Sequence, residues 1–246
     1  MSIDYNELAK DYDLTRIANI NTINLFAAEM PLNNKLILDF GCGTGNFADA
    51  IKKLTDAEIY GVEPSDGMRE KALLKGLDAR QGDHTFLPFD DDFFDFVYMT
   101  DVIHHVPNIK LMFSEFRRVL KPNGFICILT ESHKQLETRF WVKYFPATVI
   151  EEKKRYPDIS DIVKVAINTG LVHYKNVVTD VERDFTVSED FLKIAENKGF
   201  SMFRLIEEED YTAGLAALKE DYENKTVIHN THGETLIWLK KCISDL

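Results

Sequence analysis

The chain reads Leu38-Asp39-Phe40-Gly41-Cys42-Gly43-Thr44-Gly45 where an apolar run at 36–40, predicted to be a buried strand, meets a predicted helix over 46–54. Glycine lacks a Cβ atom, so such a turn can bend sharply and let a ligand lie against the main chain. The spacing is G-x-G-x-G, whereas dinucleotide enzymes carry G-x-G-x-x-G around a pyrophosphate. The loop therefore favours a ligand without phosphates.

The segments on either side of this loop alternate between short apolar runs and helical patterns. Strands are predicted at 36–40, 58–62, 93–99, 125–130, 171–181 and 234–239. Helices are predicted at 46–54, 65–75, 108–120, 160–169, 188–197 and 207–222, while 200–206 fits a strand or a helix. Such alternation is typical of βαβ units around a parallel sheet.

The organisation along the chain follows from where this alternation stops. We expect N-terminal helices over 1–34 that form part of a cap, a ligand-binding core over 35–130 and an irregular excursion over 131–158. Residues 159–246 then complete the sheet, with a helical insertion at about 186–230. A chain of 246 residues can fold in this way as one catalytic unit.

Composition excludes several classes of protein. A formal net charge of −12 disfavours nucleic acid as a partner. The sequence shows no membrane span and no apolar signal region at its start, so we expect a cytoplasmic protein. The three cysteines are widely spaced, and we expect reduced thiols, buried or half-buried. The basic run Lys153-Lys154-Arg155 either lies on a solvated surface or attracts an anionic small molecule.

Two acidic residues follow the glycine loop at informative places. Glu63 comes at the end of the second predicted strand, a position from which a carboxylate can accept hydrogen bonds from ribose hydroxyls. Asp83 follows the next short stretch and could accept from an adenine amine, or it could serve as a turn residue.

Five stretches in this order resemble the class I S-adenosylmethionine-dependent methyltransferases. They are LDFGCGTG, GVEPSDGM, QGDHTFLPF, FDFVYMTDVIHHV and RVLKPNGFICILT, and they span 36–130. The family often has two glycines where this chain has Asn123-Gly124, and Asn tolerates the left-handed conformation of such a turn. The resemblance implies a Rossmann-like α/β fold with a seven-stranded, mostly parallel sheet, helices on both faces, a final antiparallel strand and a helical cap.

The resemblance also implies S-adenosylmethionine as cofactor, S-adenosylhomocysteine as product and a set of binding residues. Those facing the methionine part are Asp39, Gly41, Cys42, Gly43, Thr44 and Gly45. Glu63 would hold the ribose, and the rest of the set is Pro64, Ser65, Met68, Gly82, Asp83, His84 and Thr100. The segment 12–16 resembles one that folds over the cofactor in some relatives, with Tyr12 and Arg16 as contacts, but a surface helix without ligand contacts is the alternative.

The segment after the strand at 93–99 holds the candidates for catalysis. On a helical turn Asp101 would face both His104 and His105. A metal site is disfavoured, because adjacent histidines diverge around a helix, and we predict no metal. A structural role and a catalytic role stay open, and Asp101 and His105 are the catalytic candidates.

The predicted function is in-line methyl transfer to an unidentified small molecule, by a monomer or homodimer. The alternatives are a protein that binds S-adenosylmethionine without turnover and a NAD-dependent oxidoreductase. The cap over 131–158 and 186–230 is expected to recognise the substrate and to close over the methyl group. Its aromatic residues include Tyr144, a candidate substrate contact, and Arg155 could pair with a carboxylate or phosphate. The alternative is that these aromatics only pack the extra helices.

Overall fold

The computed structural model describes residues 12–15, 18–179 and 182–242, and it divides into two compact units. Unit 1 comprises Glu131–Asp158 and Val178–Thr235, while unit 2 comprises Asp4–Thr130, Ile159–Val177 and Leu236–Leu246, each as far as it is described.

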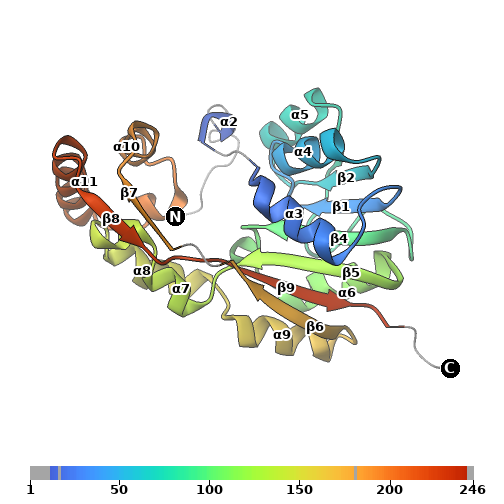
Figure 1. Cartoon of the computed structure of the whole chain (residues 1–246). Helices are drawn as coiled ribbons and strands as arrows, with labels where there is room; N and C mark the ends of the chain where they lie inside the picture. Colours follow the sequence, from blue (N-terminus) through green and yellow to red (C-terminus); the bar gives the residue numbers. More distant parts are fainter. Residues whose placement is uncertain (1–11, 16–17, 180–181, 243–246) are drawn as a thin grey trace. The chain divides into compact units, whose positions relative to one another are not determined.

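Unit 2 contains a seven-stranded sheet in the order β3-β2-β1-β4-β5-β9-β6 (Figure 1). Its strands are β1 (Leu36–Phe40), β2 (Glu58–Val62), β3 (Asp78–Arg80), β4 (Phe94–Thr100), β5 (Leu120–Thr130), β6 (Val172–Val178) and β9 (Thr235–Lys240). β1 pairs in parallel with β2 and β4, and β2–β3 and β4–β5 are parallel too. Figure 1 shows β9 running opposite to β5. The predicted α/β fold with a mostly parallel seven-stranded sheet is confirmed.

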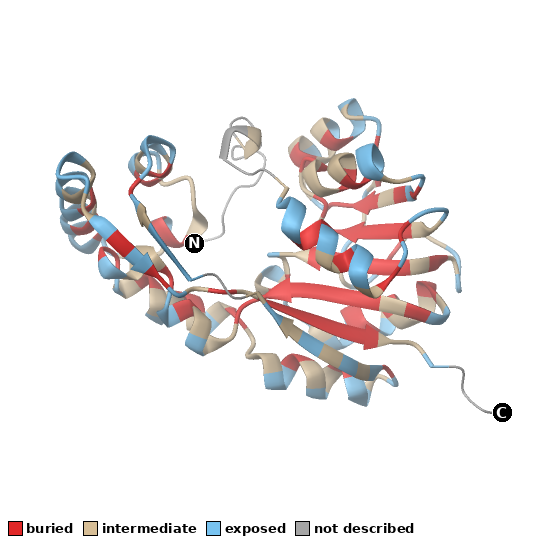
Figure 2. Cartoon of the chain, in the orientation of Figure 1, coloured by how far each residue is buried: buried red, intermediate tan, exposed pale blue. Residues whose placement is uncertain are grey.

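Helices cover both faces of this sheet, and each face has its own apolar core. One face packs on α6 (Ile109–Val119) and α9 (Ile159–Asn168). The other packs on α3 (Ile20–Glu29), α4 (Asn46–Leu54) and α5 (Asp66–Leu74). Figure 2 shows the buried residues concentrated along the central strands, as expected for parallel strands covered on both sides.

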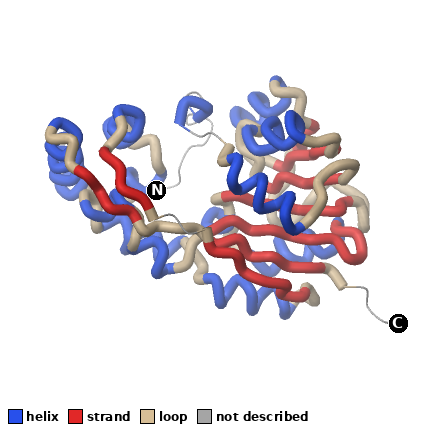
Figure 3. The backbone as a smooth tube through the Cα atoms, viewed as in Figure 1, coloured by secondary structure: helices blue, strands red, loops and turns tan. Residues whose placement is uncertain are grey.

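Unit 1 is built on a separate aromatic core. Its elements are α7 (His133–Glu137), η2 (Phe140–Lys143), α8 (Ala147–Arg155), β7 (Arg183–Thr186), α10 (Glu189–Glu196), η3 (Ser201–Arg204), α11 (Glu208–Glu223) and β8 (Val227–Asn230) (Figure 3). The core includes Phe145 and Phe203. A Cβ atom at Gly214 would lie 2.5 Å from the Phe145 ring, so this glycine lets α11 approach that ring closely.

Several local predictions were wrong in ways that have physical reasons. The helical insertion at about 186–230 also contains an antiparallel two-stranded sheet, β7–β8, whose four-residue strands are too short to show a clear alternation. β5 begins at Leu120 rather than at residue 125, and β3 was not predicted. Residues 201–204 of the ambiguous segment form a short 3₁₀ helix.

Three smaller expectations can be compared with the structure. Asn123 has φ of 65°, so its predicted left-handed conformation is confirmed. The three cysteines are free, but Cys242 is exposed, whereas Cys42 and Cys127 are buried. None of the helices in the described part of the chain is long and apolar enough to cross a membrane.

Candidate functional site

The glycine loop joins β1 to α4 in a conformation that only glycine adopts without strain. Gly41, Gly43 and Gly45 have φ of 72°, 53° and 80°. A Cβ atom at Gly41 would lie 2.7 Å from the methyl carbons of Val102, so no larger residue fits there. The amides of Gly41 and Cys42 donate to the carbonyl of Val62, which fixes the loop against β2.

Glu63 follows β2 directly and is 8% exposed. Its Oε2 accepts from the Gly43 amide at 3.0 Å, and its Oε1 accepts from the Ser65 amide at 2.9 Å. Burial raises the pKa of this carboxyl, although these two hydrogen bonds act in the opposite direction. A carboxylate can accept about four hydrogen bonds, so Glu63 can hold the loop and still accept from two hydroxyls.

Asp39 lies on β1 and is 2% exposed. Burial raises its pKa to about 7; the nearby Glu63 adds to the rise, and the Tyr98 hydroxyl opposes it. Its Oδ2 has no hydrogen-bond partner among the described residues. A buried carboxylate with an unused oxygen is suited to a cationic group such as the ammonium of an amino acid.

The predicted adenosine side is only partly supported by the local geometry. Ser65 caps α5 by accepting from the Met68 amide, and Met68 is buried. Asp83 is exposed, and its Oδ1 accepts from the amide and hydroxyl of Thr85 at 2.7 and 2.6 Å. Asp83 is therefore a turn residue, which was the alternative interpretation, and its other oxygen is not engaged in this turn.

The N-terminal segment contributes a helix of one turn, α2 (Tyr12–Thr15). The Tyr12 ring lies 3.7 to 4.0 Å from the position that a Cβ atom would take at Gly43. Asp13 accepts a hydrogen bond from the Thr44 hydroxyl of the glycine loop. The predicted contact Arg16 lies outside the described residues.

The catalytic candidates follow β4 but not on one helical turn. Asp101 has φ of 57° and precedes the 3₁₀ turn η1 (Ile103–His105), so the predicted helical spacing between Asp101 and the histidines was wrong. The rings of His104 and His105 lie with centroids 4.0 Å apart. Asp101 and His105 are exposed, and Thr100 ends β4 beside them. In the part of the chain that is described, no group of three His, Cys, Asp or Glu could hold a metal.

The predicted substrate residues lie in unit 1 and differ in their surroundings. Tyr144 is 5% exposed in the aromatic core, and its hydroxyl donates to Asp221 at 2.7 Å, which is the packing role of the alternative interpretation. Arg155 ends α8, and its Nη1 donates to Ser201 at 3.4 Å. Its Nη2 is buried without a hydrogen-bond partner in the described residues. The preceding Lys153 and Lys154 each pair with a glutamate, so they belong to a solvated surface.

A buried ionic cluster in unit 1 was not predicted from the sequence. Arg139 is 7% exposed; it donates to both carboxylate oxygens of Glu131 and to one of Glu152. His232 Nε2 lies 2.9 Å from Glu131. Burial acts to raise the pKa of both glutamates. For Glu131 the hydrogen bonds from Arg139 and His232 outweigh burial, so its pKa is lowered overall. For Glu152 burial prevails, and its pKa is raised.

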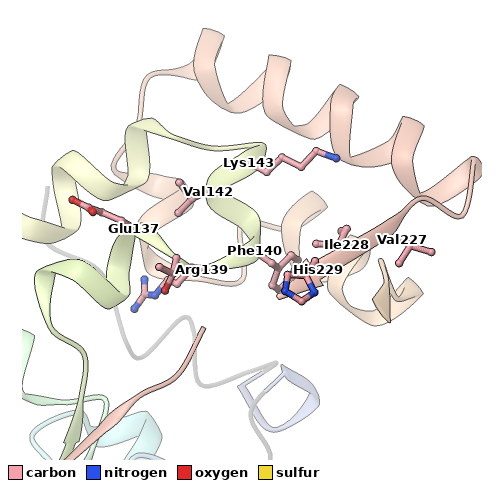
Figure 4. A pocket seen from close by; sticks show the side chains of 9 residues that line it. Glu137, Arg139, Phe140, Val142, Lys143, Val227, Ile228 and His229 are labelled. Carbon is pink, nitrogen blue, oxygen red and sulfur yellow. The ribbon is translucent and has the colours of Figure 1, made fainter. Parts of the chain in front are cut away.

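An open pocket of about 340 Å³ lies in unit 1 between η2 and β8 (Figure 4). Its ionisable lining residues are already engaged: Lys143 with Asp221, His229 with Asp184, Glu137 with Lys153, and Arg139 with Glu131 and Glu152. Because a ligand would have to displace these partners, the pocket is a poor binding site.

Tyr98 and Lys75 lie beside the predicted cofactor residues but were not predicted from the sequence. Neither residue falls in a glycine-rich or acidic motif.

Comparison with known proteins finds similarity in the part of the chain that holds the candidate site. A family model described as a methyltransferase domain matches residues 38–128, the stretch that holds the glycine loop, Asp39 and Glu63. Residues 38–128 thus match the class I S-adenosylmethionine-dependent methyltransferases, the family that the sequence motifs resemble. S-adenosylmethionine is the cofactor of this family.

Individual relatives cover different parts of this chain. The sterol 24-C-methyltransferase of Schizosaccharomyces pombe is 34% identical over 96 residues, which are 36% of this chain and 25% of that protein. The chain thus spans about a quarter of the sterol enzymes that it matches. A demethylmenaquinone methyltransferase of Staphylococcus aureus is 25% identical over 213 residues, 80% of this chain and 78% of that protein.

A solved structure extends the similarity of fold beyond the motif region. A putative methyltransferase from an antibiotic biosynthesis pathway of Anabaena variabilis superposes with a TM-score of 0.71 at 22% identity. The match covers 91% of this chain and 98% of that one.

Proposed function

We propose that this protein transfers the methyl group of S-adenosylmethionine to a small molecule. The observation that carries the proposal is the glycine loop at the end of β1, held by Glu63 and accompanied by the buried Asp39. A phosphate-free cofactor with a free ribose and an amino-acid end needs this combination of groups.

The sulfonium cofactor, when bound, supplies an activated methyl group. The chain therefore has to bind and orient the two reactants and to exclude water. Glu63 would accept from the ribose hydroxyls of the cofactor, and Asp39 would bind its ammonium through the unused Oδ2. Fixing the two reactants in line lowers the barrier by roughly 7 to 11 kcal/mol in favourable cases.

Asp101 and His105 are our candidates for removing a proton from the substrate. Their support is position: both follow the carboxyl end of β4, and both are exposed. Ligands of open parallel sheets bind at that edge. A base is needed only where the attacking atom retains its proton, as a hydroxyl does and a neutral amine does not.

The substrate is a small molecule, in our proposal. The similar proteins include a sterol 24-C-methyltransferase and a demethylmenaquinone methyltransferase, whose names point to small molecules, and the net charge of −12 opposes a nucleic acid. Arg155 is the residue that we assign to an anionic group of the substrate, because one nitrogen of its guanidinium is buried without a partner within the described residues.

Calorimetry and product detection test the proposal in one series. We expect S-adenosylmethionine and S-adenosylhomocysteine to bind and NAD not to bind, and a metabolite extract supplied with labelled methyl donor to yield a labelled product. Binding without any labelled product across such extracts would make the chain a cofactor-binding protein. Tighter binding of NAD would make it an oxidoreductase.

A further inference from the structure

Lys75 stands out because it contacts the glycine loop and the N-terminal segment at once. It is the C-cap residue that follows α5, and its Nζ donates to Asp13 at 3.0 Å. The same nitrogen lies 3.4 Å from the Thr44 hydroxyl and donates to Asn46. Thr44 in turn donates to Asp13. Asp13 is therefore held by a cation from α5 and by a hydroxyl from the loop.

These contacts decide where Tyr12 lies. A one-turn helix such as α2 is not stable by itself, because nucleation costs more than one turn returns. The Tyr12 ring nevertheless lies against Gly43, the residue whose amide Glu63 binds. Asp13, its neighbour in the chain, is tied by charge to the rest of the unit. The anchoring of Asp13 thus helps to fix the position of Tyr12 over the loop.

The electrostatic environment of Asp13 supports its anchoring by Lys75. Burial by itself raises the pKa of Asp13, but the hydrogen bonds from Thr44 and Lys75 outweigh it and lower the pKa. The Lys75 and Asp13 side chains are 27% and 36% exposed, so the pair is neither fully solvated nor deeply buried. A contact of this kind is strong enough to bias a short segment and weak enough to open.

We propose that Lys75 is a positioning residue that holds Asp13 and thereby keeps Tyr12 over the glycine loop, slowing the release of a cofactor bound there. This inference rests on the proposed function for its ligand. The pair acts as a latch: in its closed state Tyr12 covers the loop at Gly43, and its opening releases α2.

The test uses Lys75→Met, Lys75→Arg, Asp13→Asn and the Lys75→Met/Asp13→Asn double variant. Lys53→Met is the matched control, because it removes the same charge from an exposed pair with Asp49 on the neighbouring helix. Dissociation of S-adenosylhomocysteine should become about three- to tenfold faster in Lys75→Met, the range expected for a partly exposed ion pair with added hydrogen bonds. Lys75→Arg should restore slow release, and the double variant should be no faster than the faster single variant.

A second readout needs no ligand. Chymotrypsin cleavage after Tyr12 in the free protein, followed by mass spectrometry, should be faster in Lys75→Met and Asp13→Asn than in wild type or Lys53→Met. Equal cleavage in all these proteins would overturn the latch, as would release of the ligand at the wild-type rate. Tighter binding in Lys75→Met would also overturn it, because Tyr12 would then obstruct the site. A wild-type protein that binds no cofactor would refute the proposed function, and the cleavage rates would still decide on the latch.

Discussion

The buried carboxyl of Asp39 predicts an unusual dependence of stability on pH. Its pKa is about 7 in the folded protein, against 3.8 for an exposed aspartate. The difference of roughly three units corresponds to about 4 kcal/mol, at about 1.4 kcal/mol for each unit. Because the folded-state pKa is raised, the folded chain binds the proton more tightly than the unfolded chain does. This contribution to stability is thus lost as pH rises from about 4 to about 7 and is fully lost above 7.

The substitution Asp39→Asn removes this titration while keeping the size of the side chain. Between pH 5 and pH 8 wild type should lose about 3 kcal/mol of unfolding free energy relative to the variant, since most of the window lies below the folded-state pKa. Other carboxyls titrate in both proteins, so the difference between the two curves isolates Asp39. The variant should also bind S-adenosylmethionine about 10- to 100-fold more weakly, because the ammonium loses its charged acceptor.

Urea unfolding at pH 5 and pH 8 measures the effect. The protein has two tryptophans: Trp238 lies in unit 2, with Asp39, and Trp141 lies in unit 1. A Trp141→Phe background therefore lets fluorescence report on unit 2. Asp83→Asn is the control, because Asp83 is exposed and Thr85 lowers its pKa. If wild type and Asp39→Asn lose stability in parallel between the two pH values, burial does not raise the pKa of Asp39 and the reasoning is refuted.

Four further substitutions test individual roles. Glu63→Ala should weaken cofactor binding by about 1 to 3 kcal/mol in calorimetry, since hydrogen bonds to a charged acceptor are lost. An unchanged dissociation constant would mean that Glu63 only holds the glycine loop and does not bind the cofactor. His105→Ala should lower turnover by about 100-fold with cofactor affinity intact if it removes a proton, and normal turnover would make it structural. Arg155→Ala should raise the KM for an anionic substrate without lowering Tm, whereas a lower Tm with normal kinetics would assign Arg155 to packing. Arg139→Met should destabilise unit 1 by about 3 to 5 kcal/mol in urea unfolding followed by Trp141 fluorescence, because two buried glutamates lose their partner; a small loss would mean that the glutamates take up protons instead.

The stretch from Leu36 to Thr130 could be predicted largely from sequence. Apart from β3, which was not predicted, and the first residues of β5, the strands there are short, apolar and bounded by turns, and the glycine loop and Glu63 come at strand ends. Those features are local, so they can be seen without knowing what packs against them. Unit 1 was less predictable, because β7 and β8 pair across about 40 intervening residues and each is only four residues long.

The roles of single residues divide along the same line. The sequence by itself indicated most strands of the sheet, the resemblance to a methyltransferase family and the loop that we propose for the cofactor, since glycine spacing and strand ends depend on neighbouring residues. Only the tertiary structure decided that Asp83 serves a turn, that Tyr144 packs in a core and that Asp39 has a raised pKa. Lys75 reaches Asp13 across 62 positions of the chain. Burial and charge pairing depend on which groups the fold brings within a few ångströms, and no local pattern records that.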